Sequence, residues 1–530
     1  MLKLKLKEVK GKEEALAPLY KLVKGRKFKS EVKAKFHLLI LYLAALASAE
    51  VSSKELFKFI GRMKEPLGVI AQVFRRLDLL VNKWGYNQVE ACKIVAQVLP
   101  KCELKELLFR LSQAIGVGLP VKDFAAIEYS KFLVVFQDEY ERAMDRLRRL
   151  CEAYSAMLTA SAFISVAMML VSMIYGASSP TTILSLTALM ITATIFLTLY
   201  LMFRSSPHSK VVTLSELSPR KLRQIERLVP SLMLLSGVVA TVPSVLFILG
   251  FLKIPSVLEA SIFLSKCLPI PLPLMIAGVP LLVVGLKGKR LVEEIKLMDT
   301  YYPVFIKTLG DAAAVSGSIN EAVKAVVYND YGPLTPLVKR LYKRLKMGIK
   351  TEIGWRLFEK ESGSDLINQS TEVFFNAVKN GGRAKESALA LFDFASLILN
   401  LRKKRSQVVG FLKGLVFPLQ ATLISVLTLM KALMSIFFEF ARLVSSYVSF
   451  IGYVEESLML IFLLSVTLIL TFGNIMALHL VEGEAHSSMA YYGGVLLLIA
   501  GVIMWLVDGS ASSIFSVFAR FTTEVESIAP

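Results

Sequence analysis

The side chains that usually carry out chemistry are few in this chain, and they form no recognisable constellation. The stretch Gly285–Lys289 combines two glycines with two lysines, but it is too short for a phosphate-binding loop. No metalloprotease, nucleophile-elbow or paired-cysteine motif occurs anywhere in the 530 residues. We therefore expect no catalytic, cofactor-binding or metal-ligating residues, and no enzymatic activity.

Histidines and cysteines are scattered. His479 and His486 lie seven residues apart near the end of an apolar stretch, where they could share a helix face and bind a metal ion or sense pH. We favour the simpler interpretation, in which they are interfacial polar residues. The cysteines are too far apart for metal-type spacing and are expected to be buried or incidental thiols; they are Cys92, Cys102, Cys151 and Cys267.

Composition and charge indicate a membrane protein with large soluble parts. Hydrophobic residues make up 55% of the chain and the mean hydropathy is +0.58. Residues 1–154 hold 29 basic and 18 acidic residues, residues 204–228 hold 6 and 2, and residues 287–407 hold 21 and 13. Because basic segments resist transfer across a membrane, we expect the N-terminus and all three blocks in the cytoplasm. Nucleic-acid binding is not expected, since no such motif is present and the charge follows the topology.

Seven apolar stretches are long enough to cross a bilayer as helices. Counting from a cytoplasmic N-terminus, they place the basic loop 204–228 inside and the C-terminus outside. Residues 432–456 are apolar enough to be an interfacial helix or part of a longer, bent span. The expected spans are 155–175, 181–203, 229–251, 267–286, 408–431, 457–480 and 489–507.

The two long basic blocks contain an internal duplication. Residues 36–56 match residues 304–323 at an offset of 268. Each copy then has a potential capping box, Ser52 with Glu55 and Ser318 with Glu321, followed by a proline that breaks the chain. We expect each copy to form an antiparallel bundle of five or six short helices, whose last helix continues into a span. Later helices are expected at 86–99, 103–116 and 121–150 in copy one, and at 351–361, 364–380 and 383–405 in copy two.

These features define the fold class and a division of the chain. We expect an all-α, polytopic membrane protein with two cytoplasmic antiparallel helical bundles and about seven transmembrane helices. The predicted parts are a basic N-terminal tail (1–30), a first bundle (31–154), four spans that include loop 204–228 (155–286), a second bundle (287–407), about three spans (408–507) and a C-terminal tail (508–530).

Copy two resembles the F-domain of type II secretion and type IV pilus platform proteins. The residues that carry the resemblance form a helix end, a helix start, a turn and a paired-glycine turn: Ser316, Gly317, Glu321, Tyr331, Gly332, Pro333, Gly381 and Gly382, with the helix start Gly363–Leu366. Copy one is degenerate and has Ala49 where copy two has Gly317. The junction at 132–166 and the number of spans resemble the archaeal branch, which builds archaella and archaeal pili.

The resemblance implies a platform that anchors a hexameric secretion ATPase and helps move pilin-like or archaellin subunits into a filament. It also implies a homodimer embedded in membrane lipid. On this basis we hypothesise that six cations contribute to ATPase contact: Arg75, Arg76, Arg340, Lys343, Arg344 and Lys346. Solvated helix faces and contact with anionic lipid headgroups stay open for the same residues. The alternative function is a polytopic transporter or channel with cytoplasmic regulatory bundles.

Overall fold

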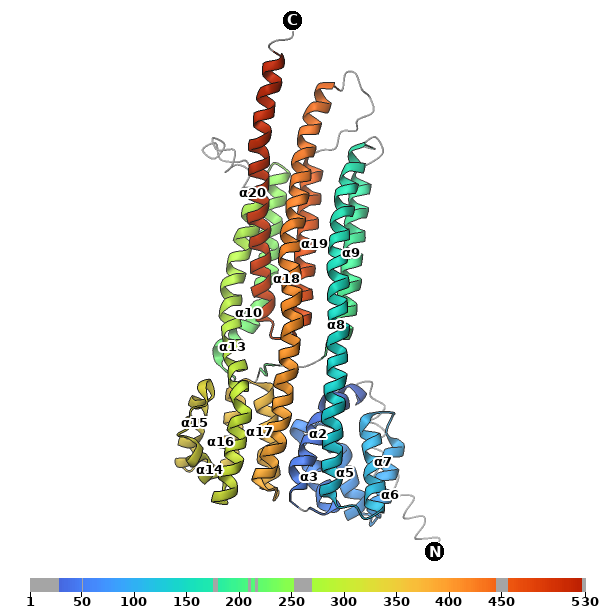
Figure 1. The fold of residues 1–530 in the computed structure, drawn as a ribbon, viewed down its shortest axis with the longest axis vertical. Coiled ribbons are helices and arrows are strands. Elements are labelled where there is room, and N and C mark those ends of the chain that lie inside the picture. Colours follow the sequence, from blue (N-terminus) through green and yellow to red (C-terminus); the bar gives the residue numbers. More distant parts are fainter. Residues whose placement is uncertain are drawn as a thin grey trace. The chain divides into compact units, whose positions relative to one another are not determined.

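The computed structural model describes residues 28–49, 51–174, 180–207, 211–214, 218–251, 269–444 and 456–526 (Figure 1). In these ranges every regular element is a helix, apart from one isolated antiparallel bridge between Val212 and Ser364. The expected all-α class is confirmed. The N-terminal tail and residues 445–455 lie outside the described residues.

The chain forms two compact units. The first, here called the bundle unit, consists of residues 1–141, 210–219 and 293–402, and the second, the span unit, of residues 142–209, 220–292 and 403–530. Three helices contribute residues to both units: α8 (Val121–Ile174), α13 (Pro271–Ser316) and α18 (Ala384–Val444). The expectation that the last helix of each bundle continues without a break is therefore confirmed for α8 and α18.

The helices of the bundle unit surround one continuous hydrophobic core. Side chains from both copies enter it, and Trp355, Tyr42, Tyr302 and Phe74 are among the largest fully buried ones. The shorter helices are α2 (Phe28–Ala47), α3 (Ser53–Arg62), α4 (Lys64–Leu67), α5 (Val69–Asn82), α6 (Gln88–Val98), α7 (Glu103–Gly116), α14 (Ile319–Val326), the 3-10 turn η2 (Gly332–Leu334), α15 (Thr335–Lys346), α16 (Thr351–Ser362) and α17 (Asp365–Lys379).

The two copies of the duplication pack against each other inside this unit. Helix α2 of copy one contacts α17 of copy two, and Ser387 Oγ donates to the carbonyl oxygen of Ala45 at 2.8 Å. Most of α2 is buried, and its apolar run forms part of the hydrophobic core. The boundaries 31–154 and 287–407 for two separate domains stay a prediction.

Of the two expected capping boxes, one is confirmed and one is wrong. At the start of α3, Ser52 accepts from the backbone of Glu55, and the Glu55 carboxylate accepts from Ser52 N–H at 3.1 Å. At the start of α14, Ser318 occupies the N-cap position but its side chain makes no cap hydrogen bond. There the Glu321 carboxylate lies 3.7 Å from Lys324 Nζ, so it faces its own helix surface.

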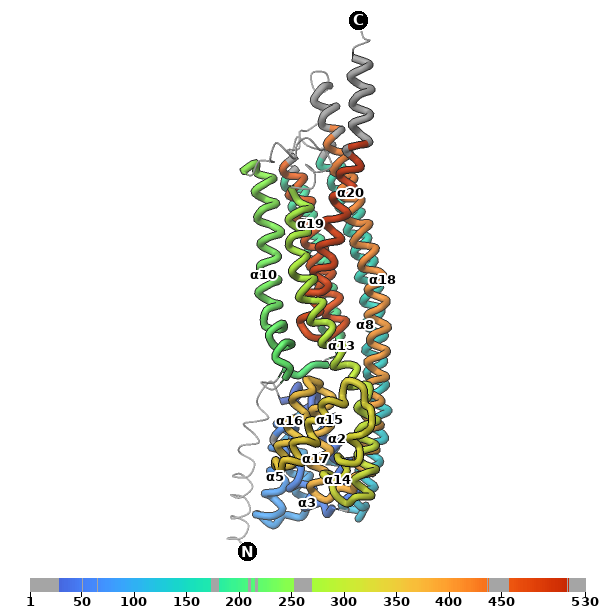
Figure 2. The backbone as a smooth tube through the Cα atoms, turned by 90° about the vertical axis from the view of Figure 1, so that its left-hand side faces the viewer, coloured from blue at the N-terminus to red at the C-terminus, as the bar shows by residue number. Residues whose placement is uncertain are grey.

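The span unit is built from long apolar helices. Besides its share of the three long helices, it contains α9 (Pro180–Ser205), α10 (Arg220–Ile248), α19 (Glu456–Glu482) and α20 (Ser487–Glu526). Helix α10 packs on α19 and α20 at the edge of this unit (Figure 2). The expected count is confirmed, since seven described helices are long and apolar enough to cross a membrane. Helix α18 continues to Val444, so residues 432–444 extend a span.

Candidate partner-contact surface

The basic face of α15 divides into paired and unpaired cations. Arg344 is 18% exposed and forms an ion pair with Glu361 of α16, and Arg340 Nε lies 3.2 Å from the same carboxylate. An arginine presents its donors in a planar, rigid fork that matches a carboxylate, whereas a lysine offers the donors of one ammonium nitrogen. These two arginines therefore hold α15 against α16 and share the single negative charge of Glu361.

Lys343 and Lys346 are different. Both are exposed, and no ion pair or hydrogen bond of either is found among the described residues. With Lys339, which is also exposed, they occupy helix positions i, i+4 and i+7 and share one face. This row of three unpaired lysines is the part of α15 that is free to meet an acidic surface.

The copy-one candidates lie on α5. Arg75 is exposed and Arg76 half-buried. A Cβ atom on Gly61 would come within 2.9 Å of Arg75 N, so this glycine lets α3 approach the backbone of α5 closely. Helix α5 belongs to copy one and α15 to copy two, and among the described residues no hydrogen bond or ion pair joins the two sets of candidates.

The turn at Tyr331, Gly332 and Pro333 has a structural role. Tyr331 is buried, its hydroxyl lies 2.8 Å from Thr308 Oγ1 of α13, and its N–H donates to the Thr335 hydroxyl at 2.7 Å. Gly332 has a φ of 54°, and a Cβ there would lie 2.8 Å from the ring of Tyr301. The turn thus fastens the start of α15 to α13 and requires glycine both for its conformation and for space.

The remaining motif residues shape two helix ends. Ser316 Oγ lies within hydrogen-bond distance of the carbonyl oxygens of Ala312 and Ser318, and Gly317 takes a φ of 70° that ends α13. Gly381 has a φ of 96°. A Cβ on Gly382 would come within 3.1 Å of the Ala45 carbonyl oxygen, so this glycine permits the close contact between the two copies.

A buried carboxyl pair in copy two was not anticipated from the sequence. Burial, with a smaller contribution from the neighbouring carboxylate of Glu372, raises the pKa of Glu359 on α16 to about 9. Burial also raises the pKa of Glu372 on α17 to about 7, with a contribution from Glu65 of copy one. Helix periodicity could have revealed this burial from the sequence, because Glu359 falls on the buried face of α16 between Trp355 and Ser362.

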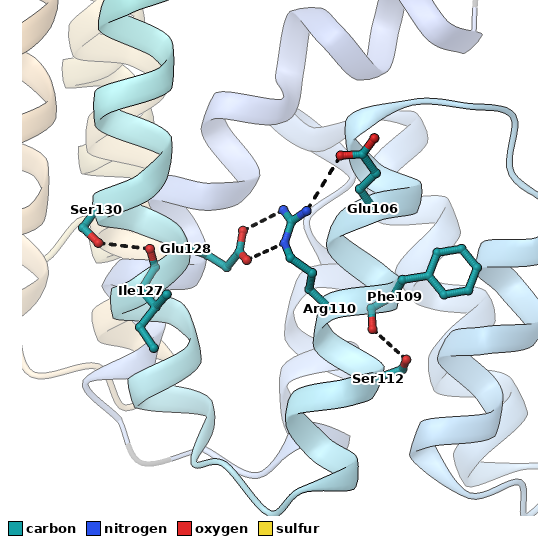
Figure 3. A network of polar contacts seen from close by, with 7 residues as sticks. All are labelled: Glu106, Phe109, Arg110, Ser112, Ile127, Glu128 and Ser130. Carbon is teal, nitrogen blue, oxygen red and sulfur yellow. Dashed lines mark hydrogen bonds and ion pairs between the residues drawn. The ribbon is translucent and has the colours of Figure 1, made fainter.

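Copy one contains an ion pair that joins two of its helices. Arg110 of α7 donates from Nε and Nη2 to the two carboxylate oxygens of Glu128 on α8, at 2.6 and 2.8 Å (Figure 3). Glu106 lies 3.8 Å away on the next turn of α7. The side chain of Glu128 is buried, and a bidentate geometry of this kind is strong and directional. This network joins α7 to α8, so neither Arg110 nor Glu128 is a candidate for partner contact.

The span unit contains a buried polar chain that was also missed. Tyr154 OH donates to Asn474 Oδ1 at 2.7 Å, the Asn474 amide donates to Gln420 Oε1, and the Gln420 amide donates to Thr471 Oγ1 at 2.6 Å. These residues come from α8, α18 and α19. Each donates to the next, so the chain is a closed set of contacts between helices, and polar residues of this kind hold spans together.

Two lysines of α18 form ion pairs with carboxylates on neighbouring helices of the span unit. Lys431 lies 3.0 Å from Asp508 on α20, and Lys413 lies 3.3 Å from Glu482 on α19. Lys431 is 6% exposed, and Lys413 is half-buried. A charge among apolar helices is costly unless a partner neutralises it, and here the partner comes from a neighbouring helix.

The histidine pair does not form a metal site in the described residues. The rings of His479 and His486 stack with centroids 5.8 Å apart, and His479 Nδ1 lies 2.9 Å from Ser488 Oγ. Nowhere in the described part of the chain do three or more His, Cys, Asp or Glu side chains gather as a metal would need. The contacts of both rings are those of packed polar residues between α19 and α20.

Seven long apolar helices and a helical bundle unit define a multi-pass, all-helical membrane protein. Within that class, the chain is a distant homologue of archaeal flagella accessory protein J. It is 27% identical over 397 residues to flagella accessory protein J of Methanocaldococcus jannaschii, which covers 74% of this chain and 68% of that protein. It is 25% identical over 394 residues to flagella accessory protein J of Methanococcus voltae, with the same coverage of both chains. No family model matches the chain, and no solved structure matches it.

Proposed function

We propose that this protein is the membrane platform of an archaellum or a related pilus-like filament. In this role it couples a cytoplasmic hexameric secretion ATPase to the insertion of pilin-like or archaellin subunits. The observation that carries the proposal is the homology to flagella accessory protein J over 74% of the chain. The proposal also assigns the N-terminus and both bundles to the cytoplasm, in line with their basic charge.

The platform role is non-catalytic. The sequence contains no phosphate-binding loop, and energy for assembly would come from the partner ATPase. Three helices connect the bundle unit covalently to spans, since α8, α13 and α18 each carry residues of both units. A partner bound to the bundle unit could therefore act on the membrane part through helices that contain no break.

We assign the ATPase contact first to the unpaired lysines of α15. Lys343 and Lys346 offer positive charge that no neighbouring carboxylate neutralises. Arg340 and Arg344 contribute mainly by holding α15 on Glu361. Arg75 and Arg76 on α5 form a second, separate patch. Complementary charge of this kind raises the rate of association and selects the partner.

The test is capture of the secretion ATPase by the full-length protein in detergent. Lys343→Glu combined with Lys346→Glu should abolish capture, while Lys54→Glu with Lys58→Glu, a matched pair of exposed lysines on α3, should leave it intact. Retention by the α15 variant would move the contact elsewhere, and an Arg75→Glu, Arg76→Glu variant would then examine α5. Absence of capture by the folded wild-type protein would contradict the coupling and favour a transporter or channel.

The homodimer belongs to the same proposal. A platform that opposes a hexamer is expected to present its bundles in more than one copy. Mass measurement of the purified protein in lipid nanodiscs should give twice 58.7 kDa after subtraction of lipid and scaffold. A single-copy mass under conditions that retain ATPase capture would rule out the dimer while leaving the platform role in place.

A further inference from the structure

The segment between α9 and α10 is bound to the second copy of the duplication. Thr213 N–H donates to the Gly363 carbonyl oxygen at 2.9 Å, and Asp365 N–H donates to the Val211 carbonyl oxygen at 3.1 Å. Together these bonds make the one antiparallel bridge among the described residues, between Val212 and Ser364. The described residues on either side continue into spans, because α9 ends at Ser205 and α10 begins at Arg220.

Two side-chain hydrogen bonds reinforce this backbone bridge, and the bridge together with these bonds is here called the clip. Thr213 Oγ1 donates to Asp365 Oδ1 at 2.8 Å, and Ser218 Oγ donates to the Thr213 carbonyl oxygen at 2.8 Å. Asp365 stands in the first turn of α17, where a carboxylate is favoured by the helix dipole. A Cβ on Gly363 would lie 3.3 Å from Pro219, so the glycine that ends α16 also leaves room for the segment.

Asp365 extends the contact to copy one. Gln369 Nε2 donates to both Asp365 oxygens at 3.0 Å, and its Oε1 lies 3.3 Å from His37 Nε2 on α2. Since an amide oxygen only accepts, His37 is the donor. Burial lowers the pKa of His37, which favours the neutral imidazole, here with its proton on Nε2. Every group in the series has one consistent direction: Thr213 and Gln369 donate to Asp365, and His37 donates to Gln369.

The segment thus docks on a part of the bundle unit that is itself fixed. Ser364, which follows Gly363, caps α17 through Ile367 N–H at 3.2 Å. Its hydroxyl also donates to the buried carboxylate of Asp299 on α13, and Arg402 of α18 forms an ion pair with the same carboxylate. Asp299 is 0% exposed. The start of α17 is therefore tied to α13 and α18 at the point where the segment binds.

We propose that Thr213 and Asp365 are positioning residues that clip the α9–α10 segment to the bundle unit, so that a movement of the second copy is carried by the chain into α9 and α10. The proposal rests on the platform function above. In that function, the clip gives the ATPase-driven motion a second route to the membrane, besides the three continuous helices. The series through Gln369 to His37 makes this route responsive to both copies.

The first experiment replaces Thr213 in the full-length protein, in cells that assemble the filament. Thr213→Val keeps the shape but removes the donor, and Thr213→Ser keeps the donor. The control is Thr300→Val, because the exposed Thr300 hydroxyl bonds only to its own helix, at the Lys296 carbonyl oxygen. We expect Thr213→Val to reduce filaments per cell at least fivefold, with normal filaments in the Ser variant and the control. ATPase capture by Thr213→Val should equal that of the wild type.

A second measurement follows the clip directly. Hydrogen exchange at the Thr213 and Asp365 amides should be at least tenfold faster in Thr213→Val than in the wild type, since both amides are donors in the bridge. Asp365→Ala serves as the second variant if Thr213→Val does not accumulate. Normal filament numbers despite fast exchange would overturn the proposal, as would unchanged exchange. Loss of ATPase capture in the wild type would instead contradict the platform function itself.

Discussion

Asn380 of copy two donates from Nδ2 to the hydroxyl oxygen of Tyr42 in copy one, at a distance of 3.0 Å. Burial raises the pKa of Tyr42 to about 12, so the hydroxyl stays neutral at any physiological pH. This hydrogen bond lies between residues 338 positions apart in the chain. It shows that the two copies of the duplication, although separated in sequence by four spans, share their interior.

Removing this hydroxyl should weaken the contact between the copies. Tyr42→Phe leaves the half-buried Asn380 amide without this partner, which costs about 0.5–1.5 kcal/mol. We expect a lower thermal unfolding temperature in detergent by a few degrees. Tyr328→Phe is the matched control, since Tyr328 is 83% exposed. Equal unfolding temperatures for the two variants would show that the hydrogen bond contributes nothing to stability.

The buried carboxyl pair should make stability depend on pH. The folded-state pKa of Glu359 is about 9 and that of Glu372 about 7, both above the ordinary value of 4.5. Between the ordinary pKa and the raised pKa of each group, the folded protein holds more protons than the unfolded chain. The stability that this contributes is therefore full at low pH and falls as the pH rises, by at most about 1.4 kcal/mol per pH unit per group. Glu359→Gln should flatten this slope and raise the unfolding temperature at pH 8.

The pH profile of unfolding, measured from pH 5 to 9, distinguishes this effect from a general response of the protein. Glu90→Gln on α6 is the control, because it removes one carboxylate from the same unit and should leave the slope unchanged. An identical slope in the wild type and in Glu359→Gln would mean that Glu359 is ionised in the folded state at neutral pH.

The close approach of the two copies at Gly382 should not tolerate a side chain. A Cβ there would lie 2.8 Å from the Ala377 carbonyl oxygen and 3.1 Å from that of Ala45. We expect Gly382→Ala to destabilise the protein by about 1–3 kcal/mol, as overpacking usually does. Gly410→Ala in α18 is the control, because no heavy atom lies within 4 Å of its added Cβ and alanine favours a helix. Similar unfolding temperatures in both variants would contradict the assigned role of Gly382.

The polar chain in the span unit should behave as one unit. Asn474→Leu removes the acceptor of the Tyr154 hydroxyl and the donor to Gln420 Oε1, and Gln420→Leu removes the acceptor of the Asn474 amide and the donor to Thr471 Oγ1. Because the lost contacts overlap, the double variant should be less destabilised than the sum of the single variants, by about 1 kcal/mol. A double-mutant cycle on thermal unfolding in nanodiscs measures this coupling. Strict additivity would indicate that the two amides act independently.

Much of the local structure followed from sequence patterns. Apolar stretches of about 20 residues predicted the spans, because a helix must cover the hydrocarbon core. Helix periodicity with glycine and proline punctuation predicted α16 and α17 to within two residues at each end. The turn at Tyr331–Pro333 was expected from the resemblance to the F-domain pattern. These features depend on residues close together in the chain.

The tertiary structure decided which basic side chains of α15 are unpaired and which distant segments contact each other. Arg344 and Lys343 are neighbours in sequence and equally basic, yet only Arg344 meets the carboxylate of Glu361, on the next helix. Thr213 reaches Asp365 across 152 positions of sequence. A helical pattern states which face of a helix is apolar but not which helix covers it. Charge neutralisation and buried hydrogen bonds depend on that pairing, so only the folded chain separates the free lysines from the paired arginines.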